Sequence, residues 1–291
     1  METSSVRFDS KSQESLRKHI KDVKERHKLP SPPGIVTKVI NILKDPNFNA
    51  RELSRFIADD AGLAARTLSL SRSPQYAQRN QPRTVHEAVI LLGFNTVRNI
   101  AIATAAQSFL TRKSKIGDKV WAHSLAAALT ARLLAKRIHF NDPEMAFLAG
   151  LLHDVGHIIL FNGDPRGFER IIDDVQQSNE PLYLKEVEFY RFDHASVAFA
   201  LLDFWNIDEQ VNEAVMSHHN VGENRIGSLA SIIDMADYIC GKADLGFYGE
   251  VGQPDQERLG AFDCQGEEAL SRIVAETRNA FDQESLLFRE A

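Results

Sequence analysis

Residues 151–160 read LLHDVGHIIL, an apolar run that contains His153, Asp154 and His157. The interior of such a helix is normally leucine, isoleucine and valine, and aspartate is rarely buried without a partner. Two imidazoles and a carboxylate in this position have two explanations. They bind a metal ion, or they belong to an ordinary core in which each polar group is hydrogen-bonded. The polar residues of the other apolar helices help to decide between these alternatives.

The rest of the chain predicts an all-α protein. Nearly every segment repeats its apolar residues with a helical period, and no segment alternates convincingly as a strand would. The stretch 241–265 is rich in glycine and acidic residues, which predicts a loop. We predict helices at 34–43, 49–60, 60–72, 84–92, 95–110, 120–138, 143–162, 166–178, 194–205, 208–219, 225–240 and 267–286.

A polar, lysine-rich connector, TRKSKIGDK at 111–119, is the strongest boundary signal in the chain. It divides the helices into two lobes. We predict an N-terminal tail with a charged helix, an N-terminal lobe, a C-terminal lobe, and a final loop with a helix. These four parts cover residues 1–27, 28–111, 118–240 and 241–291.

Composition limits the classes of function. The net charge of −6 over 291 residues argues against a general electrostatic footprint for nucleic acid. Two cysteines, Cys240 and Cys264, without a CxxC pair predict neither a disulfide framework nor a cysteine-based zinc site. The N-terminus lacks the apolar region of a signal peptide, and no apolar run reads as long enough to span a bilayer. We therefore expect a cytoplasmic protein that makes no membrane contact.

Polar residues recur on the apolar faces of several predicted helices. His218 follows Val211 and Val215 at helical spacing, and Asp237 falls on the apolar stripe of the helix at 225–240. An unpaired carboxylate there would be costly. Each residue alone is better explained as a structural group, but together they favour a metal site. The candidate ligands are His123, His153, Asp154, His194, His218, His219 and Asp237.

This donor set suits a divalent transition metal. Imidazoles and carboxylates together bind iron, manganese, nickel or zinc. Five imidazoles cannot easily share one ion, so two ions bridged by a carboxylate are the arrangement that uses them all. That arrangement is found in many phosphoester hydrolases.

The order His123, His153-Asp154, His218-His219 and Asp237 resembles the HD superfamily of metal-dependent phosphohydrolases. Over about residues 28–240, the chain is more closely similar to the HDOD family, the HD-related output domain. The similar segments are 29–102, which begins LPSPPG, LAGLLHDVGHIIL at 148–160, DHASVAFALLDFWNI at 193–207 and VNEAVMSHH at 211–219.

The resemblance implies a two-lobed, all-helical domain that acts as an output or regulatory module in bacterial signalling. Many members of the family have lost the HD ligands, whereas this chain retains them. The resemblance places one metal site on His123, His153, Asp154 and Asp237. It implies that Asp154 bridges to a second site formed by His194, His218 and His219.

The chain also resembles the HD-GYP cyclic-dinucleotide phosphodiesterases in its ligand set. The segment after the paired histidines, HHNVGENRIGS, contains no GYP triplet, and His157 stands where those enzymes carry lysine. Both departures argue against cleavage of cyclic dinucleotides. The neighbours of the HD step are mostly apolar, and the nearby cations that the sequence offers are Arg132, Lys136 and Arg137.

Three functions remain open, and we favour the first. The chain is a signalling module with a retained metal site and a protein partner. Alternatively, it is an active phosphohydrolase for a phosphorylated or nucleotide ligand, with Asp154 and His157 as catalytic residues. The third reading is nucleic-acid binding by the helix pair at 49–70, through Arg66, Arg72 and Arg79. The acidic charge of the chain argues against it.

Overall fold

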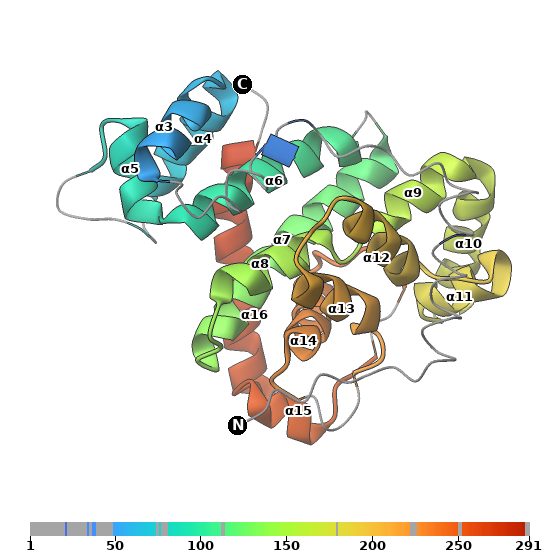
Figure 1. Ribbon diagram of the computed structural model, residues 1–291. Helices are drawn as coiled ribbons and strands as arrows, with labels where there is room; N and C mark the ends of the chain where they lie inside the picture. The colour runs from blue at the N-terminus through green and yellow to red at the C-terminus, as the bar shows by residue number, and fades with distance from the viewer. Residues whose placement is uncertain are drawn as a thin grey trace.

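In the computed structural model the described residues form helices joined by turns and loops, and none of them forms a strand (Figure 1). The structure describes residues 49–73, 76, 81–111, 114–178, 180–221, 226–249 and 252–288, together with Lys21, Gly34, Thr37 and Lys38. Single residues apart, the predicted segment 1–27 and the helix predicted at 34–43 lie outside this part of the chain, as does Arg79. The all-α, two-lobed prediction is confirmed.

A small N-terminal lobe is formed by α3 (Ala50–Ala58), α4 (Ala61–Ser71) and α5 (Val85–Leu92). Asn49 caps α3 and Thr84 caps α5, because each side chain accepts a backbone N–H of the first turn. Glu87 reaches back past Thr84 and accepts the N–H of Arg83 at 2.7 Å. Leu53, Ile57, Leu63 and Val89 form the core of this lobe.

The helix α6 (Phe94–Thr111) belongs to both lobes. Gly93, with φ of 80°, ends α5, and the chain then turns by 111° into α6. Val97 and Ala101 of α6 pack into the N-terminal core, whereas Ile102 and Ala105 pack into the larger core. The two cores therefore meet along α6, ahead of the polar connector. The predicted domain boundaries stay a prediction.

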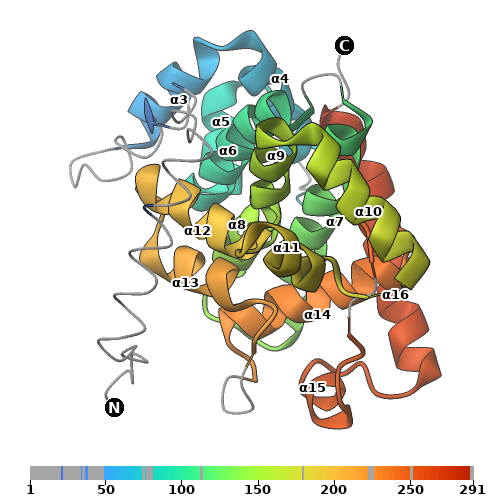
Figure 2. The same ribbon diagram turned by 90° about the vertical axis from the view of Figure 1, so that its right-hand side faces the viewer.

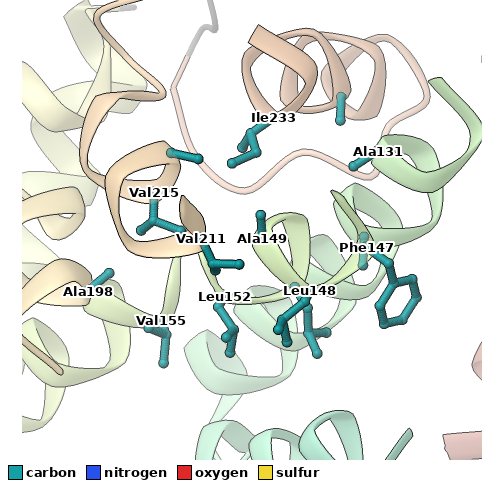
Figure 3. Close-up of a cluster of buried hydrophobic side chains, with 14 of the residues drawn as sticks. Ala131, Phe147, Leu148, Ala149, Leu152, Val155, Ala198, Val211, Val215 and Ile233 are labelled. Carbon is teal, nitrogen blue, oxygen red and sulfur yellow. The ribbon is translucent and has the colours of Figure 1, made fainter. Parts of the chain in front are cut away.

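The larger lobe is built around α7 (Lys115–Arg137), a long alanine-rich helix that is mostly buried. Its small side chains let α8 approach closely, since a Cβ on Gly150 would stand 2.8 Å from the Ala127 carbonyl oxygen. Figure 3 shows Leu152 and Val155 packed against Val211 and Val215. The remaining helices of this lobe are α8 (Pro143–Leu152), α9 (Val155–Gly163), α10 (Pro165–Ser178), α11 (Leu182–Tyr190), α12 (His194–Phe204), α13 (Glu209–Ser217), α14 (Leu229–Lys242), α15 (Gln256–Ala261) and α16 (Glu267–Ser285).

The predicted helix at 143–162 is interrupted at the HD step. Residues His153 and Asp154 form a turn between α8 and α9. In a continuous helix the Gly150 carbonyl would accept the N–H of Asp154. Instead it lies 2.8 Å from Nδ1 of His153, so the imidazole replaces a backbone donor. The interruption thus falls at the two polar side chains of the HD step.

Two further helices were not predicted. α11 follows Pro181, and α15 lies inside the stretch 241–265 that the sequence predicts as loop. The side chain of Asp255 caps α15 by accepting the N–H of Arg258 at 2.8 Å. The loop prediction was wrong for these six residues because glycine and acidic residues also suit the ends of a short helix.

The C-terminal helix α16 runs beside α7 and reaches the N-terminal lobe (Figures 1 and 2). It is followed by the 3₁₀ turn η3 (Leu286–Phe288). The Phe288 ring lies 5.4 Å from the Trp121 ring, and Arg66 of α4 lies 5.2 Å above it. Deeper in the same interface, Arg132 pairs with Glu284 at 2.6 Å. The last described residues thus link the two lobes.

Among the described residues, the segment Pro143–Gly163 has the length and apolar composition of a membrane-spanning helix. The bent pair α5–α6 passes the same test only if its two helices are taken as one span. Within the most apolar window of Pro143–Gly163, 83% of the residues are buried inside the protein. This segment is the core helix pair α8–α9.

Candidate metal centre

All seven predicted ligands meet in one place in the larger lobe. His123 comes from α7, and the turn after α8 supplies His153 and Asp154. His194 opens α12, His218 ends α13, and Asp237 lies on α14. His219 follows His218 directly, and His157 of α9 joins the same cluster. Except for the partly exposed His219, these side chains are buried.

Asp154 lies at the centre of the cluster. Its Oδ1 atom is 3.2 Å from Nε2 of His153 and 3.2 Å from Nε2 of His194. Its Oδ2 atom is 3.3 Å from Nε2 of His123. One carboxylate therefore faces imidazoles on both of its sides, which is the position that a bridging ligand between two ions would take.

On the first side, His123 is the meeting point. Its Nε2 atom lies 3.2 Å from Oδ1 of Asp237 and 3.3 Å from Nε2 of His153. His123, His153 and Asp154 form one of three groups whose ligand atoms lie within 4.8 Å of one another. Asp237 extends this group to four donors.

On the second side, Nε2 of His219 lies 2.9 Å from Nε2 of His194. The rings of His218 and His219 are 3.9 Å apart, and His194, His218 and His219 form another of the three groups. Nε2 of His218 is buried and has no hydrogen-bond partner in the described part of the chain. A buried acceptor without a partner is costly, and a metal ion at this position would satisfy it.

The imidazoles are held by their other nitrogen. Nδ1 of His123 lies 2.9 Å from the Leu245 carbonyl oxygen, and Nδ1 of His218 lies 2.6 Å from that of Val215. His153 is held in the same way by Gly150. An Nδ1–H that donates to a carbonyl leaves the Nε2 lone pair free for a metal, as in most histidine-metal sites. The donor atoms therefore fit a transition metal.

Glu186 is a member of the site that the sequence did not reveal. It is completely buried on α11, with Oε1 2.8 Å from Nδ1 of His157 and Oε2 2.7 Å from Nδ1 of His194. Its segment, LYLKEVEFY, alternates charged and apolar residues without a clear periodic signal. Burial raises the pKa of Glu186, but the two imidazoles lower it by more, so that it falls to about 2.

The buried charges affect one another strongly. Burial raises the pKa of Asp154, but the surrounding imidazoles outweigh it and hold the pKa well below its usual range. Burial and the neighbouring His153 and His194 lower the pKa of His218 to about 3. Burial lowers the pKa of His123, yet its contacts with Asp154 and Asp237 raise the pKa well above the usual value.

Gly156 allows α9 to approach the start of α12, which carries His194. A Cβ on Gly156 would stand 2.0 Å from the carbonyl oxygen of His194. α9 and the start of α12 therefore touch through their backbones. Asp193 caps α12, since its Oδ1 accepts the N–H of Ser196 at 2.8 Å. These two contacts place His194 against Asp154.

The site opens into a cleft of about 590 Å³, which lies within the usual range of small-molecule sites, about 300–1,000 Å³. His123, Asp154, His157 and Asp237 form its floor, and its walls include four aromatic residues and two cations. The aromatic residues are Tyr183, Tyr238, Phe247 and Tyr248, and the cations are Lys242 and Arg258.

The residues that line the cleft differ from those that the sequence predicts around the HD step. The apolar neighbours of the HD step, Leu151, Leu152, Ile158 and Ile159, lie in the buried core of the lobe. The three named cations do not line the cleft. Arg132 pairs with Glu284 at the lobe interface, and Arg137 pairs with Glu276 at 2.8 Å. Lys136, which is exposed on α7, lies on the same stretch of helix.

Arg66 and Arg72, two of the three arginines of the nucleic-acid alternative, are engaged within the protein. Arg66 donates to Oε1 of Gln107 at 3.0 Å, and Arg72 donates to the Pro82 carbonyl at 3.0 Å. Both side chains thus have structural partners, Arg66 on α6 and Arg72 just before α5. Absence of nucleic-acid binding stays a prediction.

The family description for the HDOD domain matches residues 29–221, which is most of the chain. The chain belongs to the HDOD family. Among curated proteins, this HDOD chain is 21% identical over 196 residues to an uncharacterised protein of Treponema pallidum strain Nichols. That alignment covers 66% of this chain but only 38% of the relative, so the chain spans well under half of the relative's length.

Solved structures show the same fold. An HDOD domain protein of unknown function from Geobacter sulfurreducens is 25% identical, with a TM-score of 0.74 over 94% of this chain and 98% of that one. A proposed phosphohydrolase from Shewanella amazonensis has 21% identity and a TM-score of 0.69 over 94% and 98% of the two chains. A proposed signal transduction protein from Marinobacter aquaeolei has 21% identity and a TM-score of 0.70, over 97% of this chain and 66% of that one.

Proposed function

We propose that this HDOD chain is a module of bacterial signal transduction that holds divalent transition-metal ions in the HD site and binds a phosphorylated ligand above them. A signalling protein partner receives the output. The observation that carries the metal part is the orientation of the imidazoles. The Nδ1 atoms of His123, His153 and His218 are engaged by backbone carbonyls, so their Nε2 atoms are free to face the cluster.

Two ions, of iron, manganese, nickel or zinc, are the cofactor that this donor set suits. The first would be held by His123, His153, Asp154 and Asp237, and the second by His194, His218 and His219, with Asp154 shared. Two of the three compact donor groups of the described residues support this division. A signalling role is supported by family membership and by the similarity to the proposed signal transduction protein of Marinobacter aquaeolei.

Hydrolysis of the bound phosphoester is the second candidate function, and the open cleft favours it. When bound, divalent ions would polarise a phosphoryl oxygen and lower the pKa of water. Asp154 would hold the ions, and His157, whose Nε2 lies 3.6 Å from Oδ1 of Asp154, is the residue proposed to assist with protons. Lys242 and Arg258 are placed in the cleft wall where an anionic group could reach them.

One experiment addresses both functions. The protein is purified without added metal, its metal content is measured, and cyclic dinucleotides, nucleotides and bis(p-nitrophenyl) phosphate are offered as substrates. We expect bound transition metal that is lost in Asp154→Ala, with little turnover of cyclic dinucleotides. Metal-free protein that stays metal-free after loading would refute the proposed metal site. Turnover by the wild type that Asp154→Ala abolishes, while circular dichroism stays unchanged, would establish the hydrolase.

A further inference from the structure

Two imidazoles and one carboxylate form a clamp at the second side of the cluster. The rings of His157 and His194 lie 3.8 Å apart with their planes tilted by 34°. One oxygen of Glu186 contacts each ring at Nδ1, at 2.8 Å for His157 and 2.7 Å for His194. A single buried carboxylate therefore sets the orientation of both rings.

The clamp turns both remaining nitrogens towards the same oxygen. Nε2 of His194 lies 3.2 Å and Nε2 of His157 lies 3.6 Å from Oδ1 of Asp154. These three residues form the third compact donor group, with ligand atoms within 4.8 Å of one another. His157 thus presents a nitrogen to the cluster, as the seven other ligands present their donor atoms.

Glu186 is fixed by more than the imidazoles. Its Oε2 also accepts the backbone N–H of His194 at 2.8 Å, which is one of the unpaired donors at the start of α12. Its side chain is completely buried. A carboxylate that is desolvated to this degree and bound to three N–H donors cannot rotate freely, so the two rings are held before any ligand arrives.

The orientation of His157 distinguishes it from a histidine that only fills the core, because its Nε2 atom faces the metal donors. Among the described residues, Nε2 of His157 contacts Asp154, and Nδ1 contacts a carboxylate rather than a backbone carbonyl. Its ring also lies 4.8 Å from the Phe247 ring in the cleft wall. The side chain is therefore at the boundary between the metal donors and the cleft, where an ion bound by it would be open to a ligand.

We propose that His157 is itself a metal ligand, together with Asp154 and His194, and that Glu186 is the positioning residue that orients both imidazoles. This inference rests on the proposed metal site. It extends that site by one donor and assigns the clamp a function. It predicts that the second side of the cluster contains His157 in addition to Asp154, His194, His218 and His219, so that the whole cluster has eight donors where the sequence indicates seven.

The test replaces the proposed ligand by one with a spectroscopic signature. His157→Cys is loaded with Co²⁺, because a cysteine thiolate bound to Co²⁺ gives a charge-transfer absorption band in the near ultraviolet. His86→Cys, an exposed histidine on α5, is the matched control, and the wild type reports on the buried Cys240 and Cys264. We expect the band in His157→Cys and its absence from the other two proteins.

Affinity provides a second measurement. His157→Gln and Glu186→Gln should each weaken Co²⁺ binding about 10- to 100-fold in competition with a chromophoric chelator, as is usual for groups that hold or orient a metal ligand. Glu188→Gln, on the same helix but with a side chain that is 74% exposed, should leave the affinity unchanged. The visible spectrum of Co²⁺ should change in Glu186→Gln, which a purely structural residue would not cause.

The outcomes separate this inference from the proposed function. If the wild type takes up no Co²⁺, the proposed metal site is refuted and the inference falls with it. If the wild type binds Co²⁺ but His157→Cys binds it without the band, and His157→Gln binds it with unchanged affinity, only the ligand role of His157 is refuted. If His157→Cys does not fold, the affinities of His157→Gln and Glu186→Gln decide.

Discussion

Gly156 lies against the backbone of His194, so closely that a Cβ at position 156 would stand 2.0 Å from the His194 carbonyl oxygen. The glycine belongs to α9 and follows the HD step by two residues, whereas His194 opens α12. This contact sets the distance between the two sides of the cluster. It explains why a residue with no side chain occurs inside the HDVGH motif.

Gly156→Ala should therefore damage both the fold and the metal site. The two backbones cannot separate without moving His194 away from Asp154, and forcing a methyl group into a packed contact costs about 1–3 kcal/mol. Urea denaturation and metal content measure the two effects. Gly62→Ala is the control, because a Cβ at that position in α4 would meet Asp60 at an ordinary distance of 3.4 Å. Equal stability of the wild type and Gly156→Ala would show that the contact is not tight.

Metal removal should destabilise the protein. Buried carboxylates and imidazoles without an ion are poorly compensated, and an ion that binds only the folded state adds stability by mass action, about 2.7 kcal/mol at a hundredfold excess over Kd. A chelator should lower the Tm of the wild type and leave that of Asp154→Ala unchanged. Asp173→Ala, an exposed carboxylate on α10, should respond like the wild type. An unchanged melting curve after verified metal removal would contradict the coupling.

Much of the fold and of the donor set could be predicted from the sequence. Helices such as α3 and α10 repeat their apolar residues with a clear helical period, and the buried polar residues Asp154, His218 and Asp237 stand out within apolar segments. Such residues can be identified from the local sequence, because a charged or polar side chain at an apolar position of a helix is costly to bury without a partner. The start of α7 was predicted wrongly, because the helix begins at Lys115, inside the segment 111–119 that the sequence predicts as a connector.

Glu186 and the break in the HD helix could not be predicted, for different reasons. Glu186 lies in a segment where charged residues are common, and only the packing of α11 against α9 and α12 makes it buried. The break at His153 and Asp154 depends on an imidazole that takes a backbone acceptor, while the helical periodicity continues across it. The cations of the cleft, Lys242 and Arg258, come from the region predicted as loop or from its edge.

The pH dependence of stability should carry a signature of Asp234. Burial raises the pKa of this carboxyl to about 6, well above its usual range, although Arg258 opposes the shift. The folded state therefore holds the proton more tightly than the unfolded state. This contribution to stability is fully present below about pH 4 and is lost as the pH rises through about 6.

Asp234→Asn should remove that dependence. In metal-free protein, the free energy of unfolding of the variant relative to the wild type should rise between about pH 4 and pH 7, by at most about 3 kcal/mol for a shift of about two pKa units. Denaturation at several pH values measures the difference. A relative stability that falls over this range would mean that the native state favours the ionised carboxylate, as its 2.8 Å contact with Arg258 alone would suggest.

The lobe interface should depend on Glu284. Its carboxylate pairs with the buried Arg132 at 2.6 Å, and removal of one partner leaves a buried charge less well compensated. Glu284→Ala should lower the free energy of unfolding by about 2–4 kcal/mol, and Glu284→Gln by less, because an amide oxygen still accepts a hydrogen bond.

Glu268→Ala is the control on the same helix, since the Arg272–Glu268 pair is exposed and should contribute little. Thermal unfolding followed by circular dichroism compares the three variants, and a loss in Glu284→Ala no larger than that in Glu268→Ala would contradict the role of the pair.

The cleft should bind an anionic ligand through Arg258. Its guanidinium lies on the wall of the cleft, held by Asp234, and a hydrogen bond to a charged group contributes about 1.5–3 kcal/mol. In metal-loaded protein, Arg258→Met should therefore weaken the binding of inorganic phosphate by about tenfold or more, because about 1.4 kcal/mol corresponds to a factor of ten. Isothermal titration calorimetry measures the affinity, and metal analysis verifies that the variant retains its ions. Arg272→Met, whose side chain is 65% exposed on α16, should bind phosphate like the wild type. If Arg258→Met binds phosphate as tightly as the wild type with its metal intact, the ligand does not reach this wall, and the metal donors alone hold it.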